Sequence, residues 1–242
     1  MRHLSFLLFL LLSISVFAED QTTHQSYPLN KNGFVSVKNV HGDITIRAWD
    51  KNEVDLKATK HGPADHLDLV EIDVDAKPDR FVVESKYPHY RSNTNVSVTY
   101  ELSVPRGATL EDIGDVNGNV DIQGVEGEVS AQTVNGSVDI DGTRGAVSAE
   151  SVNGNVHVKW AEFPSKGDVS MQSVNGGLDL KLPSQDVNAD VEASSMNGSI
   201  HSDYPITVHN SFLSHKLEGQ IGHGGVPIRL KTVNGSIDIN KY

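Results

Sequence analysis

The sequence predicts an all-β fold, a β-solenoid similar to a single-stranded β-helix, with no substantial helix beyond the first residues. The first observation behind this prediction is an eight-residue unit, Thr133 to Ile140 (TVNGSVDI), that keeps recurring. The Asn of its Asn-Gly pair falls at residues 117, 135, 153, 175, 197 and 234, in steps of 18, 18, 22, 22 and 37 residues. Self-similarity near 20 residues is typical of stacked repeats. The second observation is that apolar and polar residues alternate with period two, which is a strand signal.

The first 18 residues predict a signal peptide. A basic start at Arg2 precedes an apolar run from Leu4 to Leu12, and Val16 and Ala18 fill the small-residue positions before a cut. The apolar run is short for a membrane span. We therefore expect an exported chain that is periplasmic, cell-surface or secreted, with retention at the membrane by an uncleaved leader as the alternative.

The remaining chain divides by pattern into three parts. Residues 19–32 begin with a polar stretch and are expected to form a flexible N-terminal segment. Residues 33–110 alternate apolar and polar residues and include a diverged copy of the unit at 39–46, so they predict a β region that packs on or caps the repeats. Residues 111–242 form the Asn-Gly repeat region, with an insertion at 203–231 that we expect to form part of the other cap.

The Asn-Gly pairs are interpreted as structural turns. Both residues tolerate positive φ, which a tight corner requires. Strands that stack about 4.8 Å apart place like side chain over like side chain, so that a column of Val becomes a continuous core. A column of Thr and Ser also recurs two residues before the Asn in five units, at Thr133, Ser151, Ser173, Ser195 and Thr232. The predicted turn residues are Asn117, Gly118, Asn135, Gly136, Asn153, Gly154, Asn175, Gly176, Asn197, Gly198, Asn234 and Gly235.

The repeated T/S-V-N-G-x-V/I-x-I units, behind a leader and an alternating β region, resemble a bacterial family of exported β-strand-repeat proteins. That family carries the provisional name of adhesins and contains a domain of unknown function. The resemblance covers roughly residues 33–240 and implies an exported, right-handed β-solenoid. It provides no catalytic residues to carry over. The chain departs from the family pattern in its 37-residue step and at Ser202.

Acidic and His residues recur on the strand after each corner, at positions that alternate with the apolar columns. If the units stack in register, neighbouring carboxylates lie about 5 Å apart, a repulsion of roughly 1 kcal/mol in water. We hypothesise that this column binds a divalent cation, or that its histidines become protonated and neutralise the carboxylates; the alternative is a solvated strand face. Its residues are Asp121, Asp139, His157, Asp179, His201 and Asp238.

The insertion contains two further sets of residues. The spacing of its histidines (His209, His215 and His223) matches no compact metal-ligand motif, so we expect surface histidines. Its apolar residues either form a contact patch or pack the end of the stack; they are Tyr204, Ile206, Phe212 and Leu213.

Composition narrows the function classes. A net charge of −12 argues against nucleic acid and anionic membranes as partners, and the lack of Cys excludes thiolate chemistry. Polysaccharide lyases and hydrolases with β-helical folds use paired carboxylates, a role that Asp121, Asp139 and Asp179 could take, but the few aromatic residues make a poor sugar groove. We therefore assign no catalytic, cofactor or metal site.

The sequence thus predicts a non-catalytic exported protein, either an adhesin-like binder or a cell-envelope scaffold. The expected partner is a cell-surface glycan or an envelope protein. The alternatives are a carbohydrate-active β-helix enzyme and an accessory of an envelope-stress sensor. The oligomeric state stays open.

Overall fold

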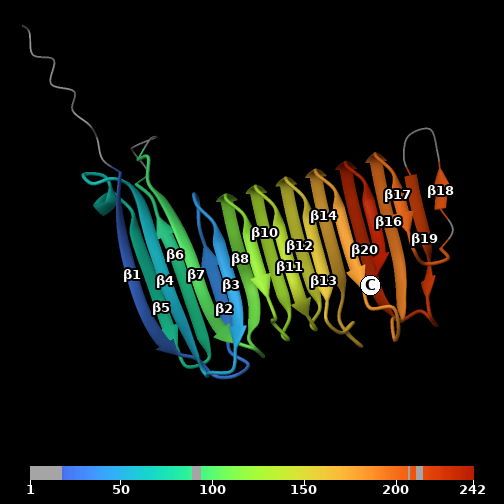
Figure 1. The fold of residues 1–242 in the computed structure, drawn as a ribbon, viewed down its shortest axis with the longest axis horizontal. Coiled ribbons are helices and arrows are strands. Elements are labelled where there is room, and N and C mark those ends of the chain that lie inside the picture. Colours follow the sequence, from blue (N-terminus) through green and yellow to red (C-terminus); the bar gives the residue numbers. More distant parts are fainter. Residues whose placement is uncertain (1–17, 89–93, 207, 211–214) are drawn as a thin grey trace, which may run out of the picture.

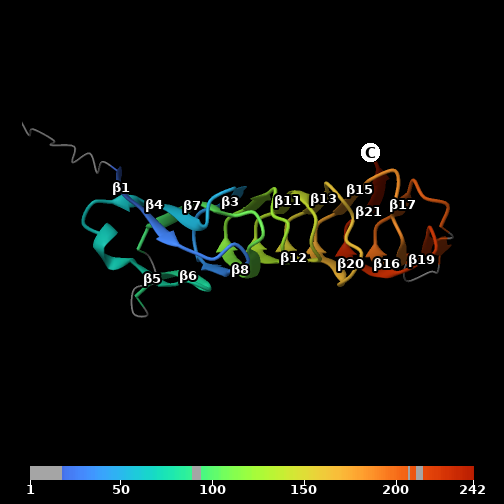
Figure 2. The ribbon, with the colours of Figure 1, turned by 90° about the horizontal axis from the view of Figure 1, so that it is seen from below.

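The computed structural model describes residues 18–88, 94–206, 208–210 and 215–242, and it shows two large mixed β-sheets packed face to face (Figure 1, Figure 2). Sheet A has ten strands in the order β1-β4-β7-β3-β9-β11-β13-β15-β21-β17. Sheet B has eleven strands in the order β18-β19-β16-β20-β14-β12-β10-β8-β2-β6-β5. The helical content of the described residues is a single 3₁₀ turn, η1 (Leu67–Leu69). The prediction of an all-β chain is confirmed.

Each repeat unit contributes one strand to sheet B and, after its Asn-Gly corner, the next strand to sheet A. The sheet B strands of the units are β8 (Thr109–Asn117), β10 (Val129–Asn135), β12 (Val147–Asn153), β14 (Val169–Asn175), β16 (Ala189–Asn197) and β20 (Val226–Asn234). The sheet A strands that follow them are β9 (Val120–Gln123), β11 (Val138–Thr143), β13 (Val156–Trp160), β15 (Leu178–Leu182), β17 (Ile200–Ser202) and β21 (Ile237–Lys241).

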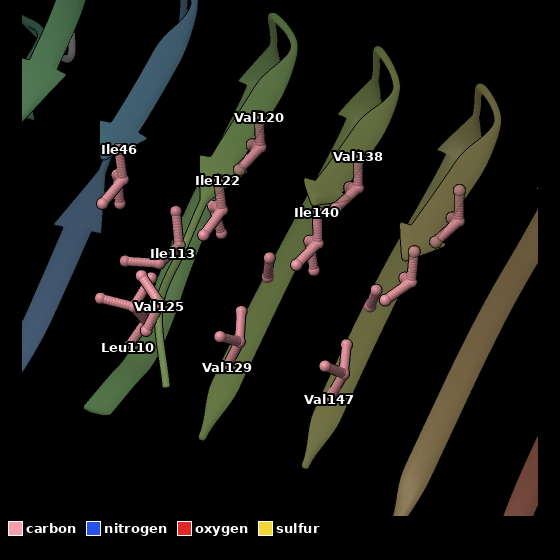
Figure 3. Close-up of a cluster of buried hydrophobic side chains, with 14 of the residues drawn as sticks. Ile46, Leu110, Ile113, Val120, Ile122, Val125, Val129, Val138, Ile140 and Val147 are labelled. Carbon is pink, nitrogen blue, oxygen red and sulfur yellow. The ribbon is translucent and has the colours of Figure 1, made fainter. Parts of the chain in front are cut away.

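Neighbouring units pair in parallel, with equivalent residues side by side. Val129 pairs with Val147 in sheet B, and Ile140 pairs with Val158 in sheet A. Alternate residues of each strand face inward, so the apolar columns of the two sheets meet in one core (Figure 3). Fully burying one such Val or Ile side chain contributes about 1.5–3 kcal/mol. The recurrence of the unit is therefore what builds the core.

The stacking order departs from the sequence order at one place. β20 lies between β14 and β16 in sheet B, and β21 lies between β15 and β17 in sheet A. The last unit of the chain is thus inserted between the two units that precede it. The 37-residue step explains this arrangement, because the intervening chain travels past the stack and returns to pair on both sides.

The insertion at 203–231 accounts for that excursion. It contains β18 (Val208–Asn210) and β19 (His215–Ile221), and its last residues belong to β20. β19 pairs antiparallel with β16, so it covers the sheet B edge of the outermost repeat unit. In sheet A the edge at the same end is the short strand β17.

The N-terminal region continues both sheets. β2 (Phe34–Lys38) pairs with β8 in sheet B, and β3 (Ile44–Trp49) pairs with β9 in sheet A, so the diverged copy of the unit occupies the next place in the stack. Both sheets are then extended by further strands, and the buried side chains of this region belong to the same core. These strands are β4 (Glu53–Pro63), β5 (Glu71–Lys77), β6 (Arg80–Lys86) and β7 (Ser97–Pro105).

The expectation of a flexible segment at 19–32 does not hold over most of its length. Ala18–Pro28 forms β1, which pairs antiparallel with β4 along its whole length. The residues of β1 are polar, but β4 offers a row of backbone donors and acceptors, and pairing satisfies those groups on both strands. Tyr27 also packs against the core beside Phe81, with ring centroids 5.3 Å apart.

Candidate binding surface

The Asn-Gly corners need glycine for a different reason from the predicted one. None of the predicted turn residues has a positive φ. A Cβ atom on Gly154 would instead lie within 2.5 Å of the carbonyl oxygen of Gly136 in the neighbouring unit, and Gly136 stands in the same relation to Gly118. Glycine is required because successive corners approach each other too closely for a side chain. The prediction of left-handed corner residues was wrong.

The corner asparagines form a ladder of side-chain hydrogen bonds. Asn135 Nδ2 donates to Asn117 Oδ1 and Asn153 Nδ2 donates to Asn135 Oδ1, each at 2.8 Å. The ladder continues through Asn175, Asn234 and Asn197 in the order in which the units stack. Each amide inside the ladder therefore both donates and accepts, which fixes its orientation along the edge of the stack.

The Thr and Ser column lies just inside this ladder and is buried. Ser151 Oγ donates to the carbonyl oxygen of Gly136 at 2.8 Å, and Thr133 Oγ1 donates to that of Gly118 at 2.9 Å. The same bond recurs from Ser173, Thr232 and Ser195. The column satisfies the carbonyl oxygens that the close approach of the corners would otherwise leave without a partner.

Asp115 and Asn39 replace the hydroxyl residues at the N-terminal end of this column. Asp115 is 4% exposed and accepts hydrogen bonds from the Asn117 backbone N–H at 2.8 Å and from Asn39 Nδ2 at 3.0 Å. Burial nevertheless raises the pKa of the Asp115 carboxyl above its ordinary value, because the two bonds do not replace the lost water.

A line of exposed apolar side chains runs along the outer face of sheet B. We call it the valine stripe; in stacking order it consists of Val116, Val134, Val152, Val174, Val233 and Met196. Four of these valines are 38–42% exposed and Met196 is 57% exposed, whereas Val233 is half-buried. Each unit adds one such residue, so the stripe has the spacing of the strands, about 4.8 Å.

A shallow groove of about 620 Å³ follows the stripe. Its other side is lined by outward residues that pair from strand to strand, and Ser194 continues their line beyond the groove. We call this line the flanking column; in stacking order it consists of Lys38, Gly114, Gln132, Glu150, Gln172, Lys231 and Ser194. Lys38 forms an ion pair of 3.0 Å with Asp112 at one end of the groove. Gln172 Nε2 donates to Glu150 Oε1 at 3.3 Å near the middle.

The acidic and His column lies on the outer face of sheet A, on the opposite side of the molecule from the valine stripe. Register pairing brings its members together in the order Asp121, Asp139, His157, Asp179, Asp238 and His201. His157 Nδ1 lies 2.9 Å from Asp179 Oδ2, as the charge-neutralising form of the hypothesis requires. Within the described ranges no three His, Asp or Glu side chains form a group that could hold a metal ion.

The pKa of the Asp139 carboxyl is raised, although the residue lies at an exposed position of its strand. The largest cause is partial desolvation by the neighbouring strands; His157 opposes the rise, and the adjacent Asp121 adds to it. None of the three lines the groove on sheet B. The column therefore has an acid of raised pKa, but that acid lies on a strand face apart from the groove.

The apolar residues of the insertion pack the end of the stack where they are described. Tyr204 is 8% exposed, and its hydroxyl donates to the Pro183 carbonyl oxygen at 3.0 Å. Ile206 packs against the core. Phe212 and Leu213 lie outside the described residues, as does the side chain of His209. Among the residues that the structure describes, His215 and His223 take part in no cluster that could hold a metal.

The sequence pattern contained a signal for the valine stripe that its analysis missed. Val134 follows Thr133 on the strand, so it falls on the polar face with Ser130 and Gln132 and out of phase with the buried residues. An apolar residue that recurs on the polar face of every unit indicates an exposed apolar line.

The family profile of Toastrack DUF4097 matches residues 113–240, just over half of the chain. The chain belongs to the Toastrack family. The matched range begins in β8 and ends in β21, so it contains the six close copies of the repeat unit and their Asn ladder. The resemblance expected from the T/S-V-N-G units is thereby confirmed.

Several solved structures resemble this Toastrack chain. One is a provisionally named cell adhesion protein from Clostridium sporogenes ATCC 15579, with 12% identity, a TM-score of 0.46, and coverage of 93% of this chain and 100% of that chain. Another is a provisionally named adhesin from Bacteroides fragilis NCTC 9343, with 14% identity, a TM-score of 0.42, and coverage of 91% and 97%. No protein of curated function matches the chain.

Over the part of the chain that the structure describes, no helix is long and apolar enough to cross a membrane. The predicted leader, residues 1–18, falls almost wholly outside that part.

Proposed function

We propose that this Toastrack protein is a non-catalytic, exported β-solenoid that acts at the cell envelope as an adhesin-like binder or scaffold, and that it binds through the outer face of sheet B. The observation that carries the proposal is the valine stripe. A contiguous line of exposed apolar side chains beside a groove is typical of an interaction surface, because isolated exposed residues need no explanation but aligned ones do.

The construction of the stripe supports a role in binding. Each valine is held on a strand that pairs on both sides, and the Asn ladder fixes the corner next to it. A partner would meet a surface that is already ordered, so little conformational entropy is lost on binding. The signal-peptide pattern at residues 1–18 supports export.

Polysaccharide cleavage is the competing proposal, and one observation favours it: the raised pKa of Asp139 beside Asp121. Glycosidic cleavage needs an acid and a second carboxylate on opposite sides of a bound sugar. Those side chains stand one above the other on one strand face, and the groove of the molecule lies on the other sheet. The geometry therefore supports binding better than cleavage.

The test compares the chain from residue 19 with a stripe variant on a glycan array and on isolated peptidoglycan sacculi. The stripe variant carries Val134→Thr, Val152→Thr and Val174→Thr, which keep the β-branched shape and replace a methyl by a hydroxyl. Its matched control carries Ser97→Thr, Ser103→Thr and Gln123→Thr, at outward positions on strands of sheet A. Each sample is measured with and without EDTA.

We expect capture by the parent chain and by the control, at least a tenfold loss in the stripe variant, and no effect of EDTA. Capture that persists in the stripe variant would contradict the assignment of the surface. Capture that EDTA abolishes would instead assign binding to the acidic and His column on sheet A. Release of sugar fragments from sacculi would overturn the non-catalytic assignment.

A further inference from the structure

The spacing of the side chains along the valine stripe restricts the kind of partner that can match it. Its side chains repeat at the strand spacing, about 4.8 Å, over six units. An extended peptide laid along the stripe would present side chains on one face every 6.6–6.8 Å, twice the rise per residue of a strand, and so would fall out of step after one or two units. A second copy of the stripe has the same period at every step. Self-association is thus a pairing in which the apolar side chains of one stripe meet those of another at the same spacing.

Two copies can meet face to face about a two-fold axis that lies along the strands. A rotation about this axis leaves the position along each strand unchanged, so the stripe of one copy faces the stripe of the other, and the two flanking columns also face each other. The order of the units along the stack is reversed between the two copies. An isologous contact of this kind closes on itself and gives a dimer. The position of the axis along the stack, that is, the repeat unit through which it passes, is then still to be determined.

The charges of the flanking column select that unit. An axis through the Glu150 unit would place two Glu150 carboxylates against each other, and an axis midway between the Gln132 and Glu150 units would place Lys38 opposite Lys231. An axis through the Gln172 unit places Glu150 opposite the partner's Lys231, and the symmetry repeats that pair. It also places Val174 opposite its own copy.

Glu150 and Lys231 are available for that pairing. They lie two strands apart in one molecule, separated by the Gln172 strand, which is about 9.6 Å at the strand spacing. Glu150 accepts a weak bond from Gln172 at 3.3 Å, and Lys231 forms no ion pair within the described part of the chain. The two symmetry-related Glu150–Lys231 pairs would each lie one unit from the axis. Two facing twisted sheets diverge least close to the axis, so the two side chains of each pair stay near each other.

We propose that the outer face of sheet B is a homodimer interface in which two valine stripes pack in reversed order about the Gln172 unit, with two Glu150–Lys231 ion pairs beside them. This inference rests on the proposed function, because it names the occupant of the proposed binding surface. The seven strands from β8 to β19 are centred on β14, and with three outward columns they give a face of roughly 29 by 13 Å, or about 800 Å² buried over both partners. An interface of this size lies below the standard range, so the dimer should be concentration-dependent.

The test is sedimentation velocity on the chain from residue 19 over a micromolar to millimolar concentration series at low salt. Glu150→Lys places like charges opposite Lys231, Lys231→Glu places like charges opposite Glu150, and the double swap restores both pairs with reversed sign. Gln123→Lys, an exposed change of the same kind on sheet A, is the control. Circular dichroism and thermal melts establish that each variant is folded.

We expect the parent chain and Gln123→Lys to dimerise with similar constants, each single swap to weaken dimerisation at least tenfold, and the double swap to return to within threefold of the parent. The Val134→Thr, Val152→Thr, Val174→Thr variant should also be monomeric. A chain that stays monomeric to millimolar concentration, or a dimer that the single swaps leave unchanged, would overturn the proposal. If a monomeric chain still captures glycan or sacculi through the stripe, the proposed function stands and self-association alone fails.

Discussion

The substitution Gly154→Ala tests the explanation that the corner residues are glycine because successive corners approach each other closely. In Gly154→Ala, the new Cβ would lie within 2.5 Å of the carbonyl oxygen of Gly136, whereas ordinary contact begins at 3.4 Å. The obstacle is backbone of the adjacent unit and cannot rotate away. The two units must therefore separate locally by more than about 1 Å at this corner.

That separation has an estimable effect on the free energy of unfolding. It lengthens the Ser151 Oγ to Gly136 O bond, now 2.8 Å, and the Gly136 N–H to Asn153 O bond, now 3.2 Å, beyond hydrogen-bonding range. Each bond contributes about 0.5–1.5 kcal/mol, and a buried carbonyl left without a donor costs about 1–3 kcal/mol more. We expect Gly154→Ala to lower the free energy of unfolding by about 2–6 kcal/mol.

Gly114→Ala is the matched control, because it adds the same methyl group to a strand of the same sheet. Its Cβ would meet no heavy atom closer than 3.7 Å, and its φ lies outside the left-handed region. We expect it to be neutral or to stabilise the fold by about 0.4–1 kcal/mol, since alanine restricts the unfolded chain. Urea unfolding followed by circular dichroism measures both variants. A Gly154→Ala variant within about 0.5 kcal/mol of the parent chain would refute the close-approach explanation.

Two further predictions concern the polar columns. Asn153→Ala removes one hydrogen bond to Asn135 and one from Asn175, so we expect the free energy of unfolding to fall by about 1–2 kcal/mol in the same urea assay. Asn52→Ala changes an exposed Asn outside the ladder and is the control; an equal loss in that variant would contradict the prediction. Burial raises the pKa of the Asp115 carboxyl above 3.8, so its charged form weakens the fold. The stability of the parent relative to Asp115→Ser should therefore rise as pH falls from 7 through the folded pKa and level off below 3.8; a constant difference or the opposite slope would exclude a buried titrating carboxyl.

The register of the repeats could be predicted from the sequence because it depends only on recurrence. Once Val138 and Ile140 recur as Val156 and Val158 at the same distance from an Asn-Gly pair, parallel pairing in register is the arrangement that buries both columns and satisfies both backbones. The alignment of the acidic and His residues follows from the same pattern.

The N-terminal strand could not be predicted in this way. The residues of β1 carry almost no apolar pattern, and their pairing partner β4 lies far along the chain. Their strand conformation comes from the open backbone edge that β4 presents, which no local composition reveals. The role of the corner glycines was hidden for a related reason, because the atom that excludes a side chain at Gly154 belongs to another unit.

The sequence by itself determined the repeat, the alternation of buried and exposed columns and the all-β class, because each depends on the residues of one unit and on their period. Only the tertiary structure decided the order of the units and the continuous valine stripe. The long connection before β20 and β21 would allow these strands to add beyond β16 and β17 or to insert before them. In the structure β20 lies between β14 and β16, where it has a paired neighbour on both sides. The order of the units is therefore set by pairing between strands that are distant in the sequence, and that order sets the sequence of residues along the valine stripe.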